Sequence, residues 1–88
     1  MFVLENRLLK TGIYKDFTGT HYRVLNTAKH TENSEELVLY RCLEGDEIGK
    51  LYATPINVFL KEVDKIKYPE ATQKYVFEWI EWGENSVI

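Results

Sequence analysis

With 88 residues, of which 44% are apolar and 14% aromatic, the chain is too short for two separately folded domains and too apolar for intrinsic disorder. Its net charge of −3 disfavours general binding to nucleic acid, since that binding depends on clustered Lys and Arg side chains. A single cysteine excludes an intramolecular disulfide, and the lack of a secretion signal or long apolar run predicts a cytoplasmic protein with no membrane contact.

The first half of the chain alternates apolar and polar residues in the way that is typical of strands. Residues 12–17 predict a short strand that ends in the turn residues 18–20. Residues 21–30 predict a longer strand, with Tyr22, Val24, Ala28 and His30 on one face. Asn26 falls on that same face and interrupts the pattern.

Residues 36–43 give the strongest strand prediction, because they are rich in strand-forming side chains and both faces carry apolar residues. The polar residues 31–35 are expected to join them to the preceding strand as a hairpin. An apolar side chain on each face is typical of a strand in the interior of a sheet.

After a glycine-containing turn at 44–49, residues 50–53 predict another short strand. Thr54 and Pro55 then resemble a helix start, with Thr54 as the N-cap and Pro55 as the first helical residue. An apolar stripe at helical spacing continues this helix for about two turns, through Ile56, Phe59, Leu60 and Val63.

The residues from 70 to 82 fit either a strand or a helix, because Tyr75, Phe77 and Trp79 alternate while other aromatic residues match helical spacing. We favour a strand, since its residues are good strand formers and a last strand would cover a sheet edge. The whole chain then predicts a mostly β fold: a small five-stranded SH3-like bent barrel with one short helix before the last strand. We expect one domain over residues 1–88, with its core at about 10–82 and peripheral ends at 1–8 and 83–88.

Ordered motifs over about residues 10–80 resemble the small bacterial and phage family catalogued as domain of unknown function 1653. The motifs are Gly12-x-Tyr14-x-x-Phe17-x-Gly19-x-x-Tyr22-x-Val24, then Ala28-x-His30-Thr31-Glu32-x-x-Glu35-Glu36-Leu37-Val38-x-Tyr40-x-x-Leu43, then Tyr52-Ala53-Thr54-Pro55 and Phe59 to Val63. The resemblance implies no activity, cofactor or partner. The family pattern tends to have histidine at position 16 and arginine at position 54, where this chain has Asp16 and Thr54.

One candidate site combines His30, Glu32 and Arg41, which could hold an anionic or polar ligand at the mouth of a barrel. The competing interpretation is structural: Thr31 bonds the loop backbone, and Glu32 pairs with Arg41 or Lys29.

A second candidate site is aromatic, because tyrosine and phenylalanine side chains from four predicted strands could converge on one groove. These residues are Tyr14, Phe17, Tyr22, Tyr40 and Tyr52. Small barrels use such surfaces to stack bases or to bind extended peptides, although core packing explains most aromatic residues in so small a domain.

We therefore expect a binding or adaptor module that engages a peptide, a protein surface, nucleic acid or a small polar ligand. Peptide, protein and small polar ligands are favoured, and nucleic acid is not favoured by the net charge. The alternative is a minimal enzyme or ligand-processing domain centred on His30, Glu32 and Arg41. We predict no catalytic residues, metal site or cofactor, and Trp79, Trp82 and Ile88 leave a homodimer contact open.

Overall fold

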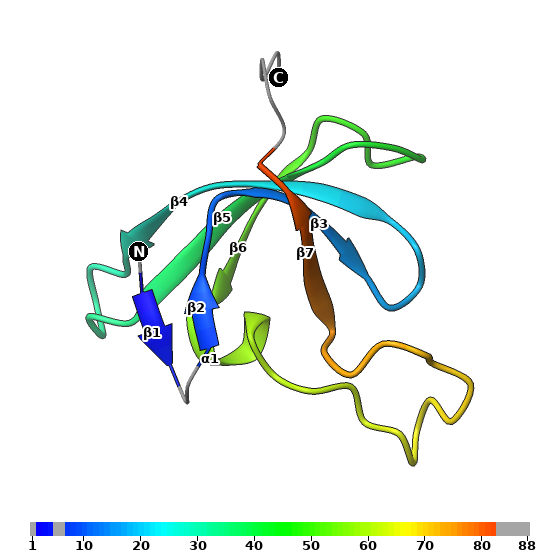
Figure 1. The fold of residues 1–88 in the computed structure, drawn as a ribbon. Helices are drawn as coiled ribbons and strands as arrows, with labels where there is room; N and C mark the ends of the chain where they lie inside the picture. The colour runs from blue at the N-terminus through cyan, green and yellow to red at the C-terminus, as the bar shows by residue number, and fades with distance from the viewer. Residues whose placement is uncertain (1, 5–6, 83–88) are drawn as a thin grey trace.

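The computed structural model describes residues 2–4 and 7–82, and its main feature is one antiparallel sheet (Figure 1). The strand order in this sheet is β6-β5-β4-β3-β7. The strands are β3 (Gly12–Asp16), β4 (His21–Lys29), β5 (Glu36–Cys42), β6 (Leu51–Pro55) and β7 (Phe77–Glu81). A single helical turn, α1 (Ile56–Phe59), lies between β6 and β7 in the chain. The predicted mostly β fold, its five strands and its short helix before the last strand are confirmed.

The amino-terminal residues add a hairpin that the sequence analysis did not predict. Strands β1 (Phe2–Leu4) and β2 (Arg7–Leu9) pair antiparallel outside the main sheet. Leu9, at the end of β2, is only 5% exposed and belongs to the hydrophobic core. Three-residue strands are too short to produce a readable alternation, which is why the pattern did not reveal them.

A β-bulge in β4 explains why Asn26 interrupted the predicted alternation. Val24 lies opposite Tyr40 and Asn26 lies opposite Leu39, so Leu25 is the extra residue in the ladder. The faces exchange at this point, because side chains alternate with a period of two. Thr27 therefore lies opposite the fully buried Val38, and Asn26 is exposed.

The helix is shorter than predicted and starts one residue later. Pro55 is its N-cap and ends β6, while Thr54 makes no capping bond. The helix stops because the backbone of the following residues pairs elsewhere: Val63 N–H donates to Lys74 O at 2.8 Å, and Val76 N–H donates to Lys61 O at 3.1 Å. Residues 61–63 thus form an extended contact with residues 74–76 and do not provide a second helical turn.

The hydrophobic core lies on one side of the sheet, where α1 and the aromatic side chains of several strands meet. The rings of Phe59 and Phe77 stack with centroids 4.2 Å apart, and Phe59 is fully buried. Tyr40 on β5 contacts Phe77 on β7 at 5.5 Å. In a flat sheet these two strands would be about 14 Å apart, since β4 and β3 separate them. The sheet is therefore strongly bent, and α1, which carries the core residue Phe59, lies on its concave side (Figure 1).

The bent sheet is open within the residues that the structure describes, since β6 and β7 are its two edges. The predicted SH3-like bent barrel is therefore not confirmed. The free edge of β6 ends in Pro55, which lies opposite Leu37 on β5. Cys42 N–H donates to Lys50 O, and hydrogen-bonded pairs recur at every second residue of an antiparallel ladder, so the Leu37–Pro55 pair, five residues farther along, is a non-hydrogen-bonded pair. Pro55 thus directs its nitrogen, which carries no hydrogen, toward the free edge. The other edge, β7, has a bulge and the charged side chains of Glu78 and Glu81.

Within residues 2–4 and 7–82, no helix is long and apolar enough to cross a membrane.

Candidate functional site

The predicted group of His30, Glu32 and Arg41 is not brought together. His30 and Glu32 lie in the loop between β4 and β5, next to Glu36. Arg41 is five residues farther along β5, a separation of about 17 Å. Its Nη1 donates to Gly49 O at 2.9 Å, in the loop at the opposite end of the strand.

The side chain and the backbone carbonyl of His30 both accept hydrogen bonds from within the β4–β5 loop. The N–H of Glu32 donates to His30 Nδ1 at 3.1 Å, and the N–H of Ser34 donates to His30 O at 2.9 Å. Glu32 is exposed, and over residues 7–82 no ion pair joins it to Arg41 or Lys29. These contacts fit the structural interpretation of the loop, with His30 in the role that the sequence suggested for Thr31.

Two of the five predicted aromatic residues lie away from the other three. Tyr14 is 1% exposed in the core, where its hydroxyl donates to Lys10 O at 2.7 Å. Phe17 packs against Tyr68 with ring centroids 4.7 Å apart, beside small hollows of about 220 and 300 Å³. Tyr14 is thus inaccessible to a ligand, and Phe17 belongs to a separate surface.

Tyr22, Tyr40 and Tyr52 converge on the concave side of the sheet, and we refer to them as the tyrosine cluster. They come from the adjacent strands β4, β5 and β6. The rings of Tyr40 and Tyr52 stack at 5.6 Å, and the ring of Tyr22 is nearly perpendicular to both, at 5.4 and 6.4 Å. Tyr40 is 8% exposed, whereas Tyr22 and Tyr52 are half-buried. The tyrosine cluster therefore has one ring in the core, that of Tyr40, and two rings that a ligand can reach in part.

Each hydroxyl of the tyrosine cluster has a side-chain partner. Tyr22 donates to Asp16 Oδ2 at 3.2 Å, and Tyr52 donates to Glu47 Oε1 at 2.9 Å. The Tyr40 hydroxyl and Thr54 Oγ1 lie 2.7 Å apart in a hydrogen bond. These bonds fix the orientation of the rings. We call Asp16 and Glu47 the rim carboxylates.

The turn between β3 and β4 holds Asp16 in place. Its Oδ1 accepts hydrogen bonds from the Thr18 N–H at 3.0 Å, the Thr18 hydroxyl at 2.7 Å and the Thr20 N–H at 3.0 Å. An aspartate that bonds the backbone two residues on is a common turn device. The Asp-Phe-Thr-Gly-Thr segment carries this signal, but sequence reasoning included neither Asp16 nor Glu47 in a site.

The two rim carboxylates and burial change the acidity of the tyrosines. Burial raises the pKa of Tyr22, and the nearby charge and hydrogen bond of Asp16 raise it further. The hydrogen bond to Glu47 is the main reason that the pKa of Tyr52 rises to about 12. Burial also raises the pKa of Tyr40, against a smaller lowering by the bond to Thr54. All three phenols are thus neutral hydrogen-bond donors or acceptors at physiological pH.

A contact between His21 and Glu44 joins the two loops beside the tyrosine cluster, which lie at the same end of the sheet (Figure 1). Glu44 Oε2 accepts hydrogen bonds from the His21 N–H at 2.7 Å and is 2.9 Å from His21 Nδ1. The side-chain bond to His21, followed by the backbone bond, lowers the pKa of Glu44.

Replacing Glu44 with glutamine is expected to reduce stability at neutral pH and to have little effect in acid. Because the pKa of Glu44 is lower in the folded chain, its charged form stabilises the fold above the ordinary glutamate pKa, and this stabilisation is lost as the pH falls through the folded value. Urea denaturation at neutral pH and at about pH 3, well below the ordinary value of about 4.3, measures the difference. Glu32→Gln, at the other end of the sheet, is the control, and equal losses at both pH values would contradict the assignment.

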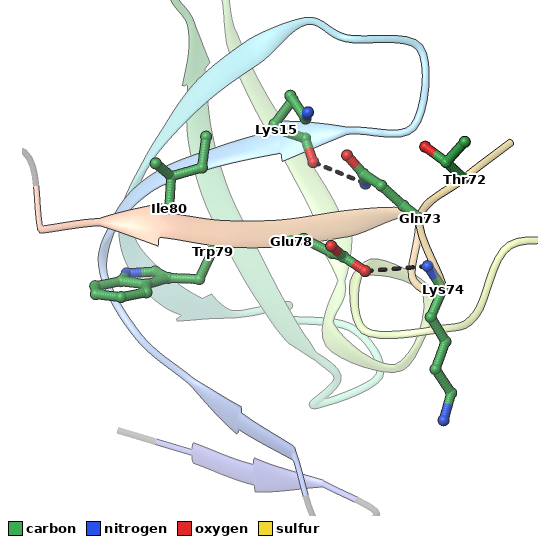
Figure 2. Close-up of a pocket in the computed structure, with 7 residues that line it drawn as sticks. All are labelled: Lys15, Thr72, Gln73, Lys74, Glu78, Trp79 and Ile80. Atoms are coloured by element: carbon green, nitrogen blue, oxygen red, sulfur yellow. Dashed lines mark hydrogen bonds between the residues drawn. The ribbon is translucent and has the colours of Figure 1, made fainter.

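A groove of about 730 Å³ lies beside β7 and contains none of the predicted site residues (Figure 2). It is lined by Lys15, Thr72, Gln73, Lys74, Glu78, Trp79 and Ile80. Gln73, which is 9% exposed, donates through Nε2 to Lys15 O at 3.2 Å and to Tyr75 O at 3.1 Å. The Glu78 carboxylate accepts the N–H groups of Lys74 and Tyr75. The side chains of Gln73 and Glu78 thus hold residues 73–75 against β3 and β7.

Over the residues with a described position, no three His, Cys, Asp or Glu side chains are grouped closely enough to hold a metal ion. Cys42 is buried, and its Sγ is 3.0 Å from Glu44 O.

Comparison with known proteins gives a family and a fold. Residues 12–78 match the model of a family described as protein of unknown function (DUF1653). A crystal structure of a DUF1653 protein from Bordetella bronchiseptica is similar, with a TM-score of 0.71 and 21% sequence identity over 91% of this chain and 95% of that one. No protein with a curated description matches the chain.

Proposed function

The chain belongs to the DUF1653 family, whose function is unknown, and from the geometry we propose that it is a binding module whose ligand contacts the tyrosine cluster. The observation that carries this proposal is the meeting of three tyrosine rings from three adjacent strands within 6.4 Å, two of them half-buried. Rigid aromatic rings with a polar tip provide a large contact area and lose little conformational entropy on binding.

The ligand that we propose is a peptide or a protein surface. Small, strongly bent β domains of the SH3-like kind bind extended peptides on aromatic surfaces, and we propose that this open sheet acts in the same way. Nucleic acid fits the cluster less well, because the carboxylates of Asp16 and Glu47 bond directly to two of its hydroxyls and would repel phosphate.

The two positions at which this chain departs from the family pattern both contact the tyrosine cluster. Asp16 accepts the hydroxyl of Tyr22, and Thr54 bonds the hydroxyl of Tyr40. Histidine and arginine at these positions would present different charges to a ligand. We therefore propose that ligand preference differs between this chain and relatives that carry those residues.

Replacing Tyr52 is the test of this proposal. A peptide selected from a displayed random library is expected to bind at least about tenfold more weakly to Tyr52→Ala, because central aromatic residues dominate such interfaces. Calorimetric titration of the purified variants gives the Kd. Tyr52→Phe retains the ring and is expected to bind more tightly than Tyr52→Ala.

Leu51→Ala is the matched control, since Leu51 is 51% exposed and lies next to Tyr52 on the other face of β6. A selected peptide that loses affinity with Leu51→Ala and not with Tyr52→Ala would place the binding surface on the convex side of the sheet. Tight, strongly salt-dependent binding of an oligonucleotide would also contradict the proposal.

A further inference from the structure

Negative charge is concentrated around the tyrosine cluster. Asp16 and Glu47 each accept a hydroxyl from one of its rings, and Glu44 is tied to His21, the residue before Tyr22. The loop of residues 43–50 contains three carboxylates and one lysine. The concave end of the sheet is therefore acidic beside its aromatic rings.

Positive groups compensate this charge only in part. Lys50 Nζ is 3.7 Å from Glu47 Oε1, and both side chains are more than half exposed, so water screens the pair. His21 contacts Glu44. Arg41 lies on the other face of the sheet, because side chains alternate along β5 and Tyr40 precedes it. Its partner across the ladder is Leu51, and its Nη1 donates to Gly49 O.

Aromatic ring faces and carboxylates both attract cationic ligands. The ring face carries negative electron density that binds a cation, and a carboxylate adds a charge-assisted hydrogen bond. A planar guanidinium can stack on a ring while its N–H groups reach a carboxylate, which an ammonium ion does less well. Because the hydroxyl of Tyr52 bonds Glu47, the ring and the carboxylate occupy adjacent positions.

We propose that the tyrosine cluster and the rim carboxylates Asp16 and Glu47 form a binding site for the arginine side chain of an extended peptide. This inference rests on the proposed function, because it names the chemistry of the ligand for the same surface. It assigns the stacking contact to Tyr52 and Tyr22, the two half-buried rings, and the ionic contact mainly to Glu47. Asp16 contributes charge, since its Oδ1 already accepts three hydrogen bonds.

An NMR titration with three matched small molecules tests the proposal. The probes are N-acetylarginine amide, its neutral isostere N-acetylcitrulline amide, and N-acetyllysine amide. The arginine probe is expected to shift the ring resonances of Tyr22 and Tyr52 in a saturable manner, with an affinity at least about fivefold higher than that of the citrulline probe. The lysine probe is expected to bind between these two.

Glu47→Gln provides the decisive variant, because the glutamine side-chain oxygen can still accept the Tyr52 hydroxyl while the charge is removed. It is expected to weaken the arginine probe about threefold to fivefold and to leave the citrulline probe unchanged. Glu32→Gln removes one carboxylate at the far end of the sheet and is expected to change neither affinity. The amide spectrum of each variant shows directly whether the fold is intact.

The outcomes separate this inference from the proposed function. Equal binding of the arginine and citrulline probes, or equal effects of Glu47→Gln and Glu32→Gln, would overturn the arginine site. If the library peptides still require Tyr52 in that case, the proposed peptide-binding function is supported and only the proposed preference for arginine is wrong. If no ligand depends on Tyr52, both proposals fail.

Discussion

Replacing Phe59 with alanine is expected to lower the free energy of unfolding by about 3–5 kcal/mol, the largest loss for any side chain in the core. Phe59 is fully buried, stacks on Phe77 at 4.2 Å, and contacts Tyr14 and Tyr40 at 5.3 and 5.2 Å. It is the residue through which α1 joins the concave side of the sheet. A chain of 88 residues has a total stability of about 4–13 kcal/mol, so this one substitution removes at least about a quarter of the free energy of unfolding.

Urea denaturation followed by circular dichroism measures this loss, and Val58→Ala is its control. Val58 precedes Phe59 in the same helical turn, is 43% exposed, and is expected to cost less than about 1 kcal/mol when truncated. Similar losses for the two variants would show that α1 is not part of the core. Valine and phenylalanine have similar helix propensities, so replacing either with alanine changes the helix propensity by a similar amount and the difference between the two variants reports on burial.

Gly12→Ala is expected to destabilise the fold by about 3 kcal/mol or more, although it adds one methyl group. Gly12 has a φ of 120°, which L-residues rarely adopt, and a Cβ there would lie 2.5 Å from Glu81 O and 3.0 Å from the Cα of Trp82. Because these contacts are with backbone atoms, the clash can be relieved only by separating β3 from the end of β7.

Gly45→Ala isolates the backbone contribution. Gly45 also has a positive φ, of 80°, but no atom lies within 4 Å of the position that its Cβ would occupy. We expect a loss of about 1 kcal/mol there from the backbone conformation alone. Chemical denaturation of both variants gives the difference, and equal losses would mean that the β3–β7 contact at Gly12 has room for a side chain.

The sequence predicted those strands whose alternation extends over several residues. β4 and β5 were predicted to within a residue at each boundary, and the two-faced pattern of β5 identified an interior strand, which pairs with β4 and β6. The preference for a strand near Phe77 was also correct, because aromatic alternation reflected real pairing with β3.

The errors arose where pairing between distant residues overrode local pattern. Pro55 and the apolar stripe that follows it matched a two-turn helix, but residues 61–63 pair with residues 74–76 in the folded chain. Closure of the sheet into a barrel depends on whether its two edges meet, and local alternation contains no information about that. The bulge at Leu25 likewise appears in the sequence only as an interrupted pattern.

In the candidate site, too, features that follow from local alternation were predicted, and features that depend on the folded shape were missed. The prediction was that five aromatic residues could converge on one groove. The rings of Tyr22, Tyr40 and Tyr52 do meet on one face of the sheet, whereas Tyr14 lies in the core and Phe17 packs against Tyr68. The grouping of Arg41 with His30 was wrong, because the predicted hairpin already places Arg41 five residues along its strand from the loop that holds His30. The acidic partner Glu47 was missed because its role depends on the folded shape of an otherwise ordinary charged loop.

The edges of the open sheet limit how this protein can assemble with copies of itself. A strand that added to β6 would meet Pro55, which offers no N–H toward that edge, and one that added to β7 would meet a bulge and two carboxylates. Both edges thus oppose the growth of a continuous intermolecular sheet, the route by which small β domains form fibrils. We therefore expect a proline, a bulge and two glutamates to protect the edges of this open sheet from such aggregation.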